Sequence, residues 1–225
     1  MLRRWDRDAE QRELEMLRQL VSRYCNHIDR ARPAFQVVDW DEEVDINRRG
    51  DALDQVQVRL RVLQPDLLFA RFRFDCNWTQ PLRLREQVEL TVRNLQVDGS
   101  PGIKLHTTSN WVKDSSMDVI VHFPAPQKEN TEVSFAINLN WPRRFKPLVE
   151  RTPDRLTVSF KRPTGHVVSK LVLPAGTDAF AEPVGDPALV KVIPGEDESG
   201  RKTVTFESFN LPARQPAGVR LELKG

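Results

Sequence analysis

The sequence predicts a mainly β protein, in which an N-terminal amphipathic α-helix precedes a body of antiparallel strands arranged as a β-sandwich. A change in the spacing of apolar residues at Pro33 is the first observation behind this prediction. Before Pro33 they recur every three or four positions, and after it they alternate every second position. The second observation is that no further long helical pattern separates the alternating runs, which argues against an α/β fold.

The predicted helix covers residues 1–32 and carries an apolar seam. The seam residues follow one another at intervals of three, four, three and four positions, and they are Leu14, Leu17, Val21, Tyr24 and Ile28. Pro33 ends the helix, because proline has no backbone N–H and disfavours helical geometry at the residue before it. The seam is about two heptads long, which is short for an independent coiled coil. We therefore expect it either to dock on the β body or to bind a protein partner or a second copy.

Period-two alternation predicts the strands of the body. Val56, Val58, Leu60 and Val62 alternate with polar or charged residues, and similar runs lie at 70–76, 88–92, 117–123, 133–141, 156–160, 204–206 and 219–223. Alternation means that one face is buried and the other is wet, which is typical of antiparallel sheets.

The body divides into two predicted ranges. We place a β-sandwich domain at 34–141 and a second β-rich domain at 153–225, with the boundary within 142–152. One continuous sandwich is the alternative, because all-β domains of about 200 residues are common.

Composition argues against several classes of protein. The net charge of +2, from 34 basic and 32 acidic residues, is smaller than is usual for a dedicated nucleic-acid binder. There are two cysteines, no apolar run long enough to cross a membrane and no apolar export-signal core at the start, so we expect a soluble cytoplasmic protein. Its four histidines lack metal-ligand spacing, and we predict neither a metal site nor a cofactor.

Two segments are candidates for ligand binding or chemistry. Arg143, Arg144, Phe145 and Lys146 interleave basic and aromatic groups and could bind an anion such as a phosphorylated ligand or nucleic acid. The alternative is a crossover whose aromatic residues pack inward. The run from Asp39 to Asp45 holds five acids in seven residues, and we expect it to be a solvated entry to a strand.

A catalytic pair is the weakest of the functional hypotheses. His106 and Ser109 lie in one polar stretch and could serve a hydrolase, but no nucleophile-elbow motif accompanies them. No catalytic or cofactor signature stands out elsewhere. The sequence therefore predicts a non-enzymatic protein-interaction or sensor module, part of a larger protein or complex, whose helix faces the partner.

Overall fold

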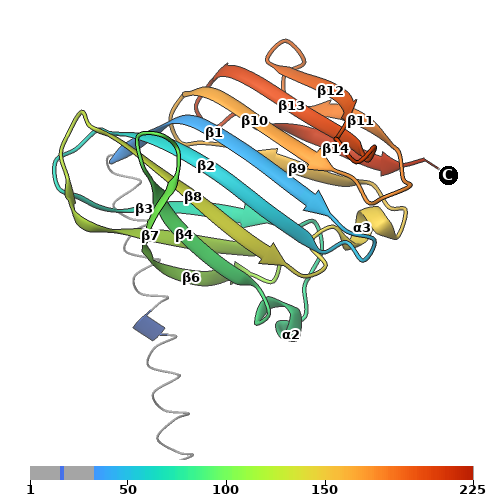
Figure 1. The fold of residues 1–225 in the computed structure, drawn as a ribbon, viewed down its shortest axis with the longest axis horizontal. Helices are drawn as coiled ribbons and strands as arrows, with labels where there is room; N and C mark the ends of the chain where they lie inside the picture. Colours follow the sequence, from blue (N-terminus) through green and yellow to red (C-terminus); the bar gives the residue numbers. More distant parts are fainter. Residues whose placement is uncertain (1–15, 18–32, 225) are drawn as a thin grey trace, which may run out of the picture.

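The computed structural model describes residues 16–17 and 33–224, and over these ranges the chain is mainly β, as predicted (Figure 1). The strands are β1 (Phe35–Ile46), β2 (Ala52–Val62), β3 (Leu67–Asp75), β4 (Glu89–Leu95), β5 (Pro101–Lys104), β6 (His106–Lys113), β7 (Ser116–Gln127), β8 (Glu132–Trp141), β9 (Asp154–Val158), β10 (Thr164–Val172), β11 (Ala179–Val184), β12 (Val190–Glu196), β13 (Lys202–Leu211) and β14 (Ala217–Leu223). Two one-turn helices join them, α2 (Leu82–Arg85) and α3 (Lys146–Val149).

The strands form one large sheet and two small ones. The large sheet has eight strands in the order β12-β13-β10-β1-β2-β8-β4-β5. The small sheets each have three strands, in the orders β3-β7-β6 and β11-β14-β9. The large sheet draws strands from both predicted ranges, 34–141 and 153–225, and these meet where β1 pairs with β10.

The pairing of β1 with β10 departs from the predicted antiparallel arrangement. These two strands run parallel, with Trp40 opposite Val167, whereas the other pairs in the three sheets are antiparallel. A parallel pair requires a long crossover connection, and here the chain between the two strands forms eight other strands first. Apolar alternation along each strand carries no information about its partner's direction.

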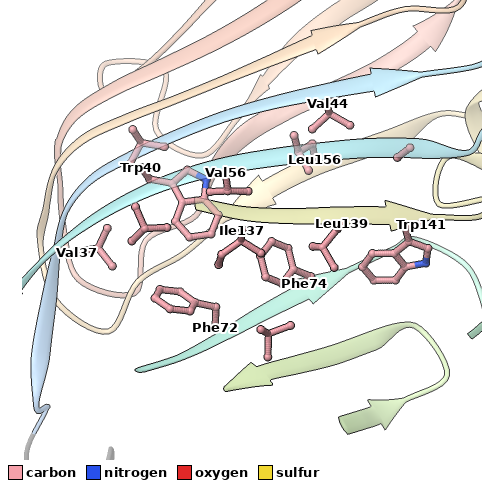
Figure 2. Packing of buried hydrophobic residues seen from close by; sticks show 14 of the residues in the cluster. Val37, Trp40, Val44, Val56, Phe72, Phe74, Ile137, Leu139, Trp141 and Leu156 are labelled. Atoms are coloured by element: carbon pink, nitrogen blue, oxygen red, sulfur yellow. The ribbon is translucent and has the colours of Figure 1, made fainter. Parts of the chain in front are cut away.

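A continuous apolar core joins the three sheets. Figure 2 shows Trp40 of β1, Phe72 and Phe74 of β3, Ile137 of β8 and Leu156 of β9 within one cluster. Phe135 of the large sheet is fully buried and packs its ring 5.7 Å from that of Phe72. The inward residues of β2, predicted from alternation, are buried at every second position.

The turn between β1 and β2 holds in place the segment that follows β8. Gly50 has a φ of +79°, and a Cβ atom at this position would lie 2.8 Å from the carbonyl carbon of Phe145. The Phe145 N–H donates to the Gly50 carbonyl at 2.8 Å. Only glycine combines this backbone geometry with so close an approach, so the turn holds the 142–149 segment against the sheet.

Most of the predicted N-terminal helix lies outside the described residues. Leu14, Val21, Tyr24 and Ile28 are among those not described, and Leu17 is helical with 48% of its surface exposed. Within the described ranges, no helix is both long and apolar enough to cross a membrane.

Candidate functional site

A cleft of about 340 Å³ opens between β3 and β9, and β1 forms its floor. Its volume is at the lower end of the range for small-molecule and peptide side-chain pockets. The lining residues come from β1 and the segment before it, from β3, and from β9 and the segment after it, together with one arginine from the chain after β8. They are Pro33, Ala34, Phe35, Val37, Trp40, Glu42, Arg71, Phe72, Arg73, Phe74, Asp75, Arg144, Leu156, Thr157, Val158, Ser159, Phe160, Lys161 and Arg162.

Aromatic rings form the inner wall of the cleft. The ring of Trp40 lies 6.0 Å from that of Phe72, 6.1 Å from that of Phe74 and 5.5 Å from that of Phe160, measured between ring centroids. Trp40, Phe72 and Phe74 project toward one another from β1 and β3 (Figure 2). This wall can take up an apolar group, because aromatic side chains offer large apolar faces.

A buried polar cluster lies beneath the aromatic wall. Glu42 accepts hydrogen bonds from Ser169 Oγ at 2.6 Å and from Trp40 Nε1 at 3.2 Å. Asp54 on β2 forms an ion pair with Arg144, and all three charged side chains are almost completely buried. Arg144 also lies over the rings of Trp141 and Phe145, at 5.2 and 5.4 Å. The run 39–45, expected to be solvated, thus places Glu42 in the core.

The pKa of Asp54 is raised to about 8, chiefly by burial; the charge of Arg144 opposes this shift, and the neighbouring Glu42 adds to it. Asp54 Oδ1 is buried without a hydrogen-bond donor among the described residues. Asp54 does not line the cleft, and its carboxyl group is held against Arg144 in the core. We therefore assign Asp54 a structural role.

The outer rim of the cleft is basic. Arg71 Nη1 lies 3.0 Å from Asp118 Oδ2, and Arg73 Nε lies 2.8 Å from Asp118 Oδ1. Two guanidinium groups thus contact one fully buried carboxylate. Lys161 and Arg162 add two exposed cations on the opposite side.

The four residues of the predicted anion-binding segment, 143–146, do not form one surface. Arg144 and Phe145 are buried, at 4% and 2% exposure, and Arg144 contributes to the floor of the cleft. Arg143 points elsewhere, since its Nη1 donates to the Arg49 carbonyl at 2.9 Å. Lys146 lies 4.7 Å from the ring centroid of Trp78. Of this group, only Arg144 reaches the cleft.

His106 and Ser109 do not form a pair. They lie three positions apart on β6, so their side chains point to opposite faces of the strand. His106 instead faces His122 of β7, with ring centroids 5.0 Å apart, and His122 Nε2 is 3.0 Å from Thr108 Oγ1. Burial, and to a lesser degree the neighbouring His106, lowers the pKa of His122. His106 and Ser109 therefore do not face each other as the hydrolase alternative requires.

Sequence reasoning missed the acids beneath the cleft, although their signal was present. Ala52, Asp54, Val56 and Val58 share the inward phase of β2, so Asp54 occupies a position that the pattern assigns to the core. Glu42 likewise has the phase of Trp40 and Val44. A carboxylate in an apolar register indicates a buried, paired group. The rim on β3 had no such signal, because outward-facing arginines are ordinary in a strand.

Comparison with solved structures shows the fold. A crystal structure of a candidate protease from Parabacteroides distasonis is 12% identical in sequence, with a TM-score of 0.55 over 84% of this chain and 40% of its own. An M1 zinc metallopeptidase from Deinococcus radiodurans is 16% identical over 84% of this chain and 42% of its own, with a TM-score of 0.43. A mutant of that enzyme bound to a Tyr-Ser-Ala substrate is 14% identical over 83% and 42%, with a TM-score of 0.49. The sequence matches no protein-family profile and no curated protein.

The prediction of a non-enzymatic interaction or sensor module is wrong in the light of these neighbours. The candidate protease from Parabacteroides distasonis shares this arrangement of strands at a TM-score of 0.55, which points to a peptidase-like fold. At these identities the likeness concerns the fold alone. This chain spans about two fifths of the length of those proteins. Within residues 16–17 and 33–224, no group of three or more histidine, cysteine, aspartate or glutamate side chains could hold a metal ion such as zinc.

Proposed function

We propose that this chain is the β-rich, peptide-binding part of a peptidase-like protein, and that the cleft between β3 and β9 is where it binds peptides. The observation that carries the proposal is that, among the described strands, each of these two is paired on one side, β3 with β7 and β9 with β14. Unpaired strand edges offer N–H and C=O groups in the spacing of a peptide backbone. The shared fold with a candidate protease supports the same assignment.

The chemistry of the cleft suits binding. Its inner wall offers the aromatic faces of Trp40, Phe72 and Phe160 to an apolar side chain. The Glu42 carboxylate in its lining is buried and accepts hydrogen bonds from Ser169 and Trp40, so we assign Glu42 no role in activating water. We assign to this chain the capture of the peptide, and we derive no step through zinc, because the described residues do not provide a site for it.

Calorimetric titration of the purified chain with mixed-sequence peptides of about six residues, a common strand length, tests the proposal. The cleft variant is Phe160→Ala, which removes a half-buried ring next to Trp40. The matched control is Phe209→Ala, which removes an exposed ring that stacks on His166 outside the cleft. We expect Phe160→Ala to weaken binding by roughly tenfold, equivalent to about 1.4 kcal/mol, and Phe209→Ala to leave it unchanged.

Two results would overturn the proposal. One is the absence of peptide binding by the unmodified chain. The other is equal binding by the Phe160→Ala and Phe209→Ala variants, which would place the peptide elsewhere. Mass spectrometry of the same mixtures, with and without added Zn²⁺, should recover intact peptides. Zinc-dependent cleavage would show that this chain itself supplies a metal centre.

A further inference from the structure

Five aromatic side chains line the cleft. They are Phe35 and Trp40 on β1, Phe72 and Phe74 on β3, and Phe160 after β9. The ring of Phe72 lies 5.9 Å from that of Phe35 and 6.0 Å from that of Trp40, measured between centroids. Trp40 in turn lies 5.5 Å from Phe160, so these rings form a row across the cleft. Phe35 and Phe160, at the two ends of the row, are half-buried, and part of each ring is exposed.

We propose that the cleft binds two aromatic side chains of one extended peptide, and that these belong to residues two positions apart in the peptide. This inference rests on the proposed function and specifies which peptides the cleft selects. The selection depends on the spacing of the two rings and requires no charge on the peptide.

The volume of the cleft fits two rings rather than one. It is about 340 Å³, whereas an apolar cavity of about 150 Å³ is enough to take up one benzene molecule. A single phenylalanine side chain would therefore fill roughly half of the cleft and leave part of the aromatic row in contact with water. A second ring would remove this apolar surface from water, which favours binding.

The arrangement of the wall residues indicates the spacing of the two rings in the peptide. Phe72 and Phe74 are alternate residues of β3, and Trp40 lies almost equally far from both, at 6.0 and 6.1 Å (Figure 2). The wall thus has the period of an extended strand. In an extended peptide, side chains two positions apart lie on one face, about 6.6–6.8 Å from each other, whereas neighbouring side chains point to opposite faces. Two alternate rings can therefore both reach the row, one toward Phe35 and one toward Phe160.

The tilt of the wall rings favours aromatic over aliphatic side chains. The planes of Phe35 and Phe72 meet at 45°, and those of Trp40 and Phe160 meet at 61°. Aromatic pairs prefer such tilted or edge-to-face contacts, and these stabilise beyond the burial of apolar area. A leucine side chain in the cleft would gain the burial but not this contribution, so we expect it to bind more weakly than phenylalanine.

Calorimetric titration of the full chain with isomeric peptides tests the inference. The probes are acetylated and amidated peptides of about six residues, built from two phenylalanines and otherwise threonine. In the alternate isomer one threonine separates the phenylalanines, and in the adjacent isomer none does, so the two peptides have the same composition and no charge. We expect the alternate isomer to bind at least about tenfold more tightly, because only one of two adjacent rings can face the wall. A leucine version of the alternate isomer should bind about threefold more weakly than the phenylalanine one.

Substitutions at the two ends of the row show whether the rings bind there. Phe160→Ala should weaken the alternate isomer about tenfold and the adjacent isomer less, so the ratio of the two affinities should fall. Phe35→Leu keeps an apolar side chain but removes the ring, and should weaken the alternate isomer about threefold. Phe209→Ala, which removes an exposed ring outside the cleft, should leave both affinities unchanged. Thermal unfolding of each variant shows whether the fold is retained.

The outcomes separate this inference from the proposed function. If the alternate and adjacent isomers bind equally, the chain binds peptides without selecting the spacing, and the inference fails alone. If neither binds, both fail. An unchanged affinity ratio in a folded Phe160→Ala variant would place the second ring outside the row and overturn the inference. Binding of N-acetylphenylalanine amide as tight as that of the alternate isomer would do the same, since one ring would then suffice.

Discussion

At the residue scale, Arg144 balances the charge in the interior. It is buried against the rings of Trp141 and Phe145, and it is the basic partner of Asp54 beneath the cleft. Buried carboxylates without a cation are strongly destabilising, because desolvation of the charge is not offset. A single side chain from the segment after β8 thus makes it possible for Glu42 and Asp54 to lie in an apolar core.

Replacement of Arg144 by an uncharged residue should destabilise the fold. We expect Arg144→Met to lower the free energy of unfolding by about 3–5 kcal/mol, because it leaves two buried acids without a positive partner. Urea denaturation measures the change. Arg143→Met is the control: it keeps the backbone geometry and alters an exposed side chain, so a shift within about 0.5 kcal/mol is expected. Equal losses in the two variants would contradict this account of Arg144.

The raised pKa of Asp54 predicts a dependence of stability on pH. Its pKa is about 8 in the folded protein against 3.8 as the reference, so the folded state holds a proton that the unfolded state releases in this range. The contribution of Asp54 to stability is therefore largest below 3.8 and is lost as the pH rises toward 8, by at most about 1.4 kcal/mol per pH unit.

Asp54→Asn should remove the part of the pH dependence of stability that Asp54 causes. Between about pH 5 and pH 8, the stability of the unmodified chain should fall relative to that of the variant, as read from urea unfolding at each pH. A constant difference between the two proteins across this range would show that Asp54 does not hold the proton.

At the scale of elements, the cleft depends on how closely β9 and β14 approach. Gly218 on β14 lies opposite Thr157 on β9, and a Cβ atom at Gly218 would be 2.1 Å from the Leu156 carbonyl oxygen. Real Cβ atoms do not approach an oxygen so closely, so any side chain must displace β9. Because Leu156 of β9 lines the cleft, a side chain at position 218 would displace one wall of the site.

We expect Gly218→Ala to destabilise the fold by more than about 2 kcal/mol and to weaken peptide binding. Thermal unfolding and calorimetric titration measure the two effects. Gly99→Ala is the comparison, because Gly99 has a φ of +81° but no atom within 4 Å of its would-be Cβ. That variant should lose only about 1 kcal/mol from backbone strain and should bind peptide normally. If Gly218→Ala binds peptide as tightly as the unmodified chain, β9 does not contribute to peptide binding.

At the scale of the whole molecule, three sheets share one core. The large sheet is continuous from β12 to β5, and strands on both sides of the predicted 142–152 boundary contribute to it. Arg201 on the connection before β13 also pairs with Asp45 of β1, at 2.6 Å between Nη2 and Oδ1. Interactions of this kind couple the unfolding of residues 34–141 to that of residues 153–225, since unfolding of either range exposes apolar surface of the other.

This coupling predicts a single unfolding transition. Phe135→Ala removes a buried ring that packs against Phe72 and Phe123, and should cost about 3–5 kcal/mol. We expect near-ultraviolet circular dichroism and tryptophan fluorescence to report the same lowered midpoint, as in two-state unfolding. Two separate transitions, with only one displaced by the substitution, would support two domains divided near 142–152.

The sequence by itself determined the β class and the inward phase of most strands. Val56, Val58 and Leu60 are buried as their alternation predicts, because a period of two is a local property of an extended backbone. Glu42 and Asp54 share this inward phase, but the run 39–45 was expected to be solvated, and the pairing of Asp54 with Arg144 has no signal in the sequence. Tertiary structure alone decided that β1 pairs in parallel with β10 and that β3 and β9 end as facing edges. These relations join residues far apart in the chain, and the free energy that selects them comes from burial of the whole core rather than from any local pattern.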